Sequence, residues 1–133
     1  MNAQQTSIAQ TCLAASHDGT MDFPSIVGTL IAAGFEGYAV DYRRGTGIYY
    51  LPDGDSVELP AVAAPGPVAA IFRADAIAAA VREAQAGAPG YSYRGFCETV
   101  TAAGCAGYMV SFPGRRVVYY GRTAESHVEH FPQ

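Results

Sequence analysis

The segment His127–His130 contains the residues best suited to hold a metal ion, two histidines and a glutamate within four positions. Alternate side chains of a β-strand project to opposite faces, so His127 and Glu129 would share one face and His130 would point to the other. Two ligands on one strand need a third from elsewhere, and His17 is the only other histidine. The spacing matches no zinc signature. We therefore expect no metal and no cofactor, and interpret the segment as a solvated strand.

Cys97, paired with one of these histidines, is the second candidate for chemistry. Reactive thiols lie in exposed, electropositive sites, often at the N-terminus of a helix. Cys97 falls in the first turns of a predicted helix, but on the apolar stripe of that helix. The total of three cysteines fits neither a closed set of disulfides nor a zinc site. We therefore expect no catalytic residue, and favour a non-catalytic module that binds a ligand or a protein. The alternative is a small enzyme that uses Cys97 or the cluster of His127, Glu129 and His130.

The composition argues against several other classes of function. Half of the 133 residues are hydrophobic and 15% are charged, which is typical of a compact domain. The net charge of -4 argues against a nucleic-acid partner, because phosphate binding needs a clustered positive surface. All eight basic residues are arginines, which excludes lysine Schiff-base chemistry. No apolar run is long enough for a membrane helix and the N-terminus lacks the pattern of a signal peptide, so we expect a cytoplasmic protein without a membrane partner.

An internal repeat organises the chain. Residues 30–50, LIAAGFEGYAVDYRRGTGIYY, return seventy positions later and without a gap as residues 100–120, VTAAGCAGYMVSFPGRRVVYY. Such self-similarity indicates one supersecondary unit used twice. We therefore predict a single domain over residues 1–133, built from two tandem pseudo-symmetric units at about residues 4–60 and 73–133.

Each unit is predicted to contain two helices followed by a β-meander. Helical spacing of apolar residues from Phe23 to Ile31 indicates a helix that ends at Gly34, and the second copy ends at Gly104. The other two helices are expected over residues 4–16 and 75–86. Strands are expected at residues 36–43, 48–51, 56–59, 106–112, 117–121 and 127–131, with an additional strand at residues 68–72. Joined edge to edge, the two units would form an α+β domain, an antiparallel sheet with helices packed on one face.

Specific function is expected where the two copies differ on the outward face of the sheet. Asp41 corresponds to Ser111 and Arg43 to Pro113 in the aligned copies. A two-residue turn at residues 44–45 would place Ile48 opposite Asp41 and Tyr50 diagonally from it. We predict that Asp41, Arg43 and Tyr50 mark a ligand pocket or a dimer seam. The partner would be a small molecule or a protein, and we expect the chain to self-associate.

The arrangement of motifs resembles the bacterial uncharacterised family DUF 1398. The first half carries DFPSIVGTLIAAGFEGY at residues 22–38. The second half carries GFCETVTAAGCAGYMV at residues 95–110, VVYY at 117–120 and HVEHFP at 127–132. The resemblance covers nearly the whole chain after about residue 7, and departs from the usual pattern at Ser111, where an acidic residue is common. It supports the predicted fold and cytoplasmic location, and it implies no established activity.

Overall fold

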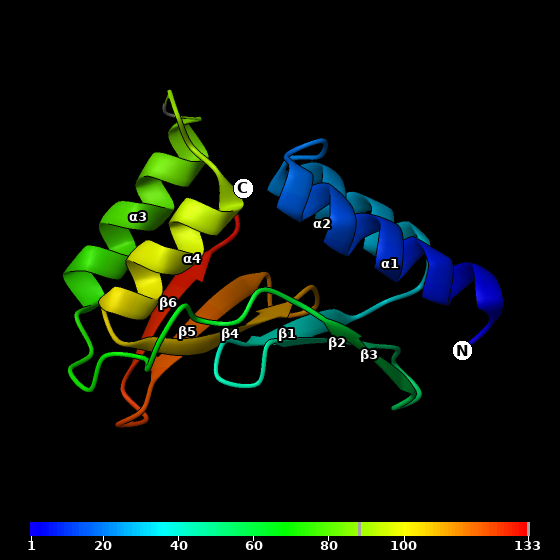
Figure 1. Ribbon diagram of the computed structural model, residues 1–133. Coiled ribbons are helices and arrows are strands. Elements are labelled where there is room, and N and C mark those ends of the chain that lie inside the picture. Colours follow the sequence, from blue (N-terminus) through cyan, green and yellow to red (C-terminus); the bar gives the residue numbers. More distant parts are fainter. Residues whose placement is uncertain (88, 133) are drawn as a thin grey trace.

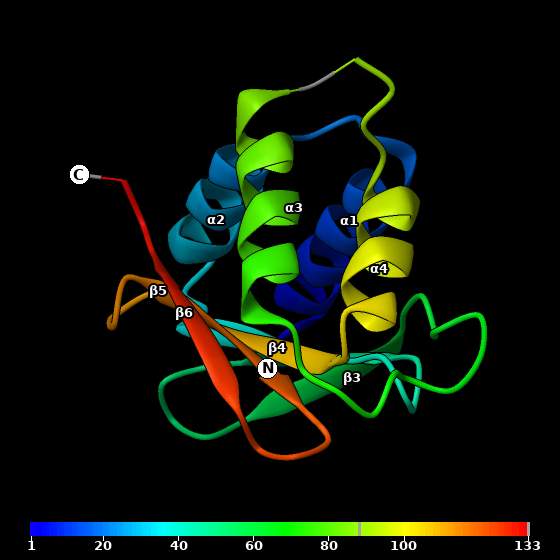
Figure 2. The same ribbon diagram turned by 90° about the vertical axis from the view of Figure 1, so that its left-hand side faces the viewer.

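A computed structural model describes residues 1–87 and 89–132 of the chain. Within these residues, four helices lie over a six-stranded antiparallel sheet, so the α+β fold is confirmed. Figures 1 and 2 show the helices together on one face of the sheet and no helix on the other face. The helices are α1 (Ala3–Asp18), α2 (Phe23–Ala32), α3 (Ala74–Ala86) and α4 (Tyr93–Ala102). The strands are β1 (Gly37–Asp41), β2 (Thr46–Tyr50), β3 (Ser56–Pro60), β4 (Cys105–Ser111), β5 (Arg116–Gly121) and β6 (Ser126–His130).

Three of the helices begin at side chains that accept hydrogen bonds from the free N–H groups of the first turn. Asn2 forms a capping box with Gln5 at the start of α1. Asp22 accepts from the Ser25 N–H at 2.9 Å in α2, and Ser92 caps α4 in the same way. The predicted ends of α2 and α4 are confirmed, because each is followed by a glycine with positive φ. No helix within the described residues has the length and apolar character needed to cross a bilayer.

The order of strands across the sheet is β3-β2-β1-β4-β5-β6. The strands that come first along the chain and those that come last therefore meet at the antiparallel pair β1–β4. In this pair Ala39 lies opposite Met109, and Gly37 lies opposite Ser111. The expectation that two meanders join edge to edge in one antiparallel sheet is confirmed.

The inner face of the sheet packs against the helices through tyrosines. Tyr38 stacks on Tyr49, with ring centroids 5.1 Å apart, and meets Tyr108 edge to face at 6.3 Å. All three side chains are buried in the core, together with Cys12 from α1 and Val100 from α4. Tyr38, Tyr49 and Tyr108 are thus packing residues.

Two local predictions are wrong. Residues 68–72 form no strand, although Val68 and Phe72 are buried. Their backbone instead supports the end of α4: the Ala69 N–H donates to the Thr101 carbonyl at 3.2 Å. The turn after β1 spans residues 42–45 rather than two residues, and this changes the register of β2.

The close approach of β1 and β4 allows the pairing of these two central strands to be tested by a substitution. A Cβ atom added at Gly37 would lie 2.4 Å from the Val110 carbonyl oxygen, so Gly37→Ala would force the two central strands apart. We expect this variant to lose about 1–3 kcal/mol of unfolding free energy, the usual cost of overpacking. Urea denaturation followed by circular dichroism measures the loss.

Gly28 supplies the matched control. It lies inside α2 with open space around it, so Gly28→Ala should stabilise the protein by about 0.5–1 kcal/mol. Equal stability of Gly37→Ala and the parent protein would contradict the register of the central strands.

Candidate functional site

The outer face of the sheet, which no described helix covers, carries apolar side chains in one line across five neighbouring strands. Each side chain of this line lies opposite the next one, on the neighbouring strand. Met109, at the centre, is 53% exposed, and Val128, at one end, is 38% exposed. In order across the sheet, this apolar row consists of Ile48, Ala39, Met109, Val118 and Val128. A contiguous line of this kind on an uncovered face is typical of an interaction surface.

Tyr120 lies beside the apolar row, near the end of β1. Gly107 pairs with Asp41 on one side and with Tyr120 on the other. A Cβ atom at Gly107 would lie 2.5 Å from the Tyr120 hydroxyl oxygen, so the tyrosine leans over the glycine. Burial raises the pKa of Tyr120, the Asp41 carboxylate raises it further, and the Arg43 guanidinium lowers it. The Tyr120 hydroxyl is therefore within electrostatic reach of both predicted site residues.

The Asp41 side chain also stabilises the turn that follows β1. Its Oδ1 atom accepts hydrogen bonds from the backbone N–H groups of Arg43, at 2.9 Å, and Arg44, at 3.1 Å. The Asp41 carbonyl accepts from the Gly45 N–H at 2.9 Å. This carboxylate therefore holds Arg43 at the exposed end of the face.

Tyr50 lies at the opposite end of the face from Asp41. The predicted register, with Ile48 opposite Asp41 and Tyr50 diagonal to it, is wrong. Thr46 pairs with Asp41, and Tyr50 pairs with Gly37. Four residues along a strand span about 13 Å, so Asp41 and Tyr50 do not share one pocket.

The tyrosine that lies near Asp41 is Tyr120 and not the predicted Tyr50. The repeat itself contains the signal, because Tyr120 is the residue seventy positions after Tyr50. The repeat does not reveal that β1 pairs with β4. This pairing places Tyr120, from the second repeat unit, beside Asp41, from the first unit. Of the three predicted residues, Asp41 and Arg43 come together and Tyr50 stands apart.

His127 and Glu129 project to the helix side of β6, and His130 projects to the other side, as predicted. The His127 Nε2 atom contacts the Glu129 carboxylate, and both side chains are about one quarter exposed. The His127 ring stacks on Tyr119 at a centroid distance of 6.5 Å, whereas His17 stacks on Tyr93. Within residues 1–87 and 89–132, no three side chains of His, Cys, Asp or Glu gather closely enough to hold a metal ion.

All three cysteines are free and buried. Cys97 is 2% exposed, and burial raises the pKa of its thiol; the neighbouring hydroxyls of Tyr42 and Tyr93 and the charge of Arg94 only partly offset this shift. A nucleophilic thiol needs access and a lowered pKa. Cys97 has neither property, so its environment is that of a structural cysteine.

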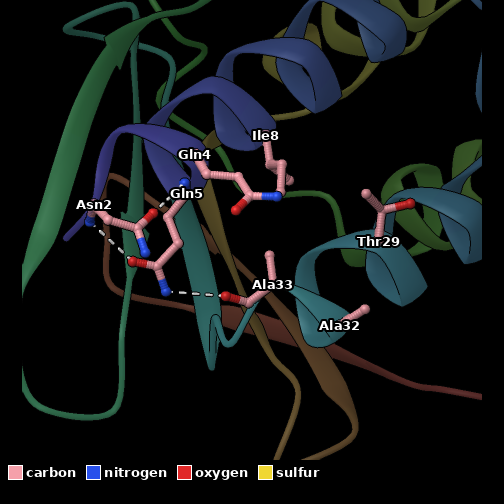
Figure 3. Close-up of a pocket in the computed structure, with 7 residues that line it drawn as sticks. All are labelled: Asn2, Gln4, Gln5, Ile8, Thr29, Ala32 and Ala33. Carbon is pink, nitrogen blue, oxygen red and sulfur yellow. Dashed lines mark hydrogen bonds between the residues drawn. The ribbon is translucent and has the colours of Figure 1, made fainter.

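The helix layer contains two shallow grooves. The larger one, about 460 Å³ in volume, lies between the start of α1 and the end of α2. Figure 3 shows the Gln5 side chain reaching across it, with Nε2 donating to the Ala33 carbonyl at 3.0 Å. No ionisable side chain lines this groove, so it can offer hydrogen bonds but no acid or base. The second groove, about 200 Å³, lies between α3 and α4 beside Tyr91 and Phe96.

The raised pKa of a buried thiol predicts how the free energy of unfolding depends on pH. Burial raises the pKa of Cys105 to about 11. Below pH of about 9 the thiol is protonated in both the folded and the unfolded chain. As the pH rises from about 9 to 11, the thiol in the unfolded chain loses its proton first. The free energy of unfolding therefore falls by up to about 3 kcal/mol. Cys105→Ala should remove this contribution and so reduce the slope of unfolding free energy against pH, while the other buried thiols and tyrosine hydroxyls, whose pKa values are also raised, maintain the rest of the slope.

Val110→Ala serves as the control for this experiment. Val110 is as buried as Cys105, so its truncation also creates a cavity, but it leaves the thiol in place. The control should show the parent slope at lower stability. An unchanged slope in Cys105→Ala would show that this thiol is not protonated more strongly in the folded state.

Comparison with known proteins identifies the family. The model of the family described as Protein of unknown function (DUF1398) matches residues 8–129. Among curated proteins, no sequence matches the chain significantly. The match begins in α1 and ends in β6, so it includes every strand of the outer face. The chain therefore belongs to the DUF1398 family.

Proposed function

We propose that this protein is a non-catalytic interaction module whose docking surface is the outer face of the sheet. The apolar row carries the proposal. Five apolar side chains aligned across five strands form an extended surface that suits another protein, whereas small-molecule sites are concave. The two grooves described above lie among the helices and not on this face.

Polar groups at both ends of the face favour a specific partner. Asp41, Arg43 and Tyr120 lie at the end of β1, and Tyr50, which is 36% exposed, lies at the other end. A hydrophobic centre with a rim of aromatic and charged groups is the usual composition of a protein interface. Asp41, Arg43 and Tyr50 thus remain site residues in this proposal, as parts of two separate rim regions.

We also propose that the two halves of the chain are copies of one unit, related by a pseudo-two-fold axis through the sheet. The strand order β3-β2-β1-β4-β5-β6 is compatible with such an axis between β1 and β4. The repeat offset of seventy positions relates Ala39 to Met109, and these two residues pair with each other at the centre of the sheet. Residues that the copies share support both halves of the fold, which leaves specificity to positions where they differ.

Site-specific photocrosslinking in the protein's own host tests the docking surface. Benzoylphenylalanine at position 109 should give adducts with a protein, because Met109 is 53% exposed at the centre of the face. The matched control is position 31, because Ile31 on α2 is 51% exposed and lies in the helix layer.

The lysine variants Met109→Lys and Ile31→Lys separate binding from stability. Both positions are on the surface, so each variant should fold within about 0.5 kcal/mol of the parent. A photoprobe at position 50, at one end of the same face, should capture the same partner. Only Met109→Lys should abolish these adducts. A position-109 probe that labels no protein would refute the interaction module.

A further inference from the structure

We propose that the occupant of the outer face is a second copy of this chain. The two sheets would lie face to face, related by a two-fold axis parallel to the strands and running between β1 and β4. The inference rests on the proposed function and names its partner. It is carried by the distribution of side-chain size and charge over the face.

The centre of the face combines a projection and a hollow. Met109, the most exposed member of the apolar row, pairs with Ala39, which has the smallest side chain in the row. The proposed axis would place β1 of one copy over β4 of the other. Met109 of each copy would then lie over Ala39 of the other, so the long side chain fills the space left by the short one. Such packing gives the complementarity found in specific interfaces.

The next strands bring further apolar side chains of the two copies together. The axis places β2 over β5, and therefore Ile48 of one copy over Val118 of the other. The outer strands follow, with β3 over β6. The apolar row of one copy thus meets the apolar row of the other from β2 to β5, with aligned strands as in packed β-sheets, and Val128 meets Glu58 at each end.

The charges at the two ends of the row select this axis. On β3 the row continues into Glu58, which is exposed. At the other end, Arg116 and His130 are paired with each other, one residue pair beyond Val118 and Val128 on the outer face. With β3 over β6, Glu58 comes near this basic pair of the second copy. An axis along the row would instead place Glu58 near Glu58 and Met109 over Met109, which opposes like charges and two projections.

The size of the face predicts a weak dimer. Six strands about 4.8 Å apart, most of them five residues long at about 3.3 Å per residue, give a face of roughly 480 Å² per copy. Two copies would bury roughly 1,000 Å², which is at the lower limit for a specific interface. Association should therefore be reversible and visible only as the concentration rises.

Sedimentation velocity over a concentration series, with the purified full chain, tests this arrangement. The wild-type protein should convert from monomer to dimer as its concentration rises to about 1 mM. Ala39→Met should place methionine against methionine, and Met109→Ala should place alanine against alanine. We expect each variant alone to raise the dissociation constant at least about tenfold, a usual effect at the centre of an interface.

An equal mixture of the two variants, Ala39→Met and Met109→Ala, is the decisive sample. In a mixed pair, the methionine introduced at position 39 of one chain lies over the alanine introduced at position 109 of the other. At the second contact of the pair, the native Met109 lies over the native Ala39. The mixture should therefore dimerise about as strongly as the wild type, although neither variant does so alone. Ile31→Ala, on the helix side, should leave the dissociation constant unchanged. Thermal unfolding of each variant establishes that it is folded.

Three results would overturn the inference: a wild-type monomer at every concentration, variants that dimerise as the parent does, or a mixture that does not recover. The photocrosslinking experiment then separates the two proposals. Adducts of the position-109 probe with a different protein, from a chain that stays monomeric, refute the second copy and leave the interaction module supported. A chain that stays monomeric at every concentration and a position-109 probe that labels no protein would together refute both proposals.

Discussion

The structure depends on the close contact between β1 and β4 at the centre of the sheet. Cβ atoms at Gly37 and Gly107 would each lie 2.4 Å from a carbonyl oxygen of the facing strand, so both positions require glycine. This pairing joins the strands of the first meander to those of the second in one sheet. It also sets the register that places Ala39 beside Met109 and Asp41 beside Gly107. A shift of one residue in this pairing would turn the core side chains of the shifted strand to the opposite face.

The central pairing separates the chain's reactive groups from its exposed surface. Alternation along the strands turns Tyr38, Tyr49 and Tyr108 toward the helices, where their rings pack on one another. Burial raises the pKa of each of these hydroxyls, and it does the same for the Cys97 thiol. Cys97 and these tyrosines are therefore parts of the core. The apolar row lies on the opposite, outer face.

Much of the fold could be predicted from the sequence because its signals are local. The N-cap residues Asp22 and Ser92 and the apolar spacing of the helices predict α2 and α4. The turn at residues 42–45 could not be predicted, because it depends on the Asp41 carboxylate binding two backbone N–H groups. The segment 68–72 has the composition of a strand, but its hydrogen bonds go to the end of α4. The site depends on which strands meet, and periodicity carries no information about that pairing.

The strand order leaves two edges open, at β3 and β6, where unpaired backbone groups can recruit further strands. Pro60 at the end of β3 lacks an N–H donor, and β6 bears a histidine and a glutamate in contact with each other. Pairing along such edges has no natural limit and leads to fibres, whereas a two-fold contact between faces is complete after two copies. The composition of the edges thus opposes unlimited growth, and the proposed contact between two apolar faces would give a closed assembly instead.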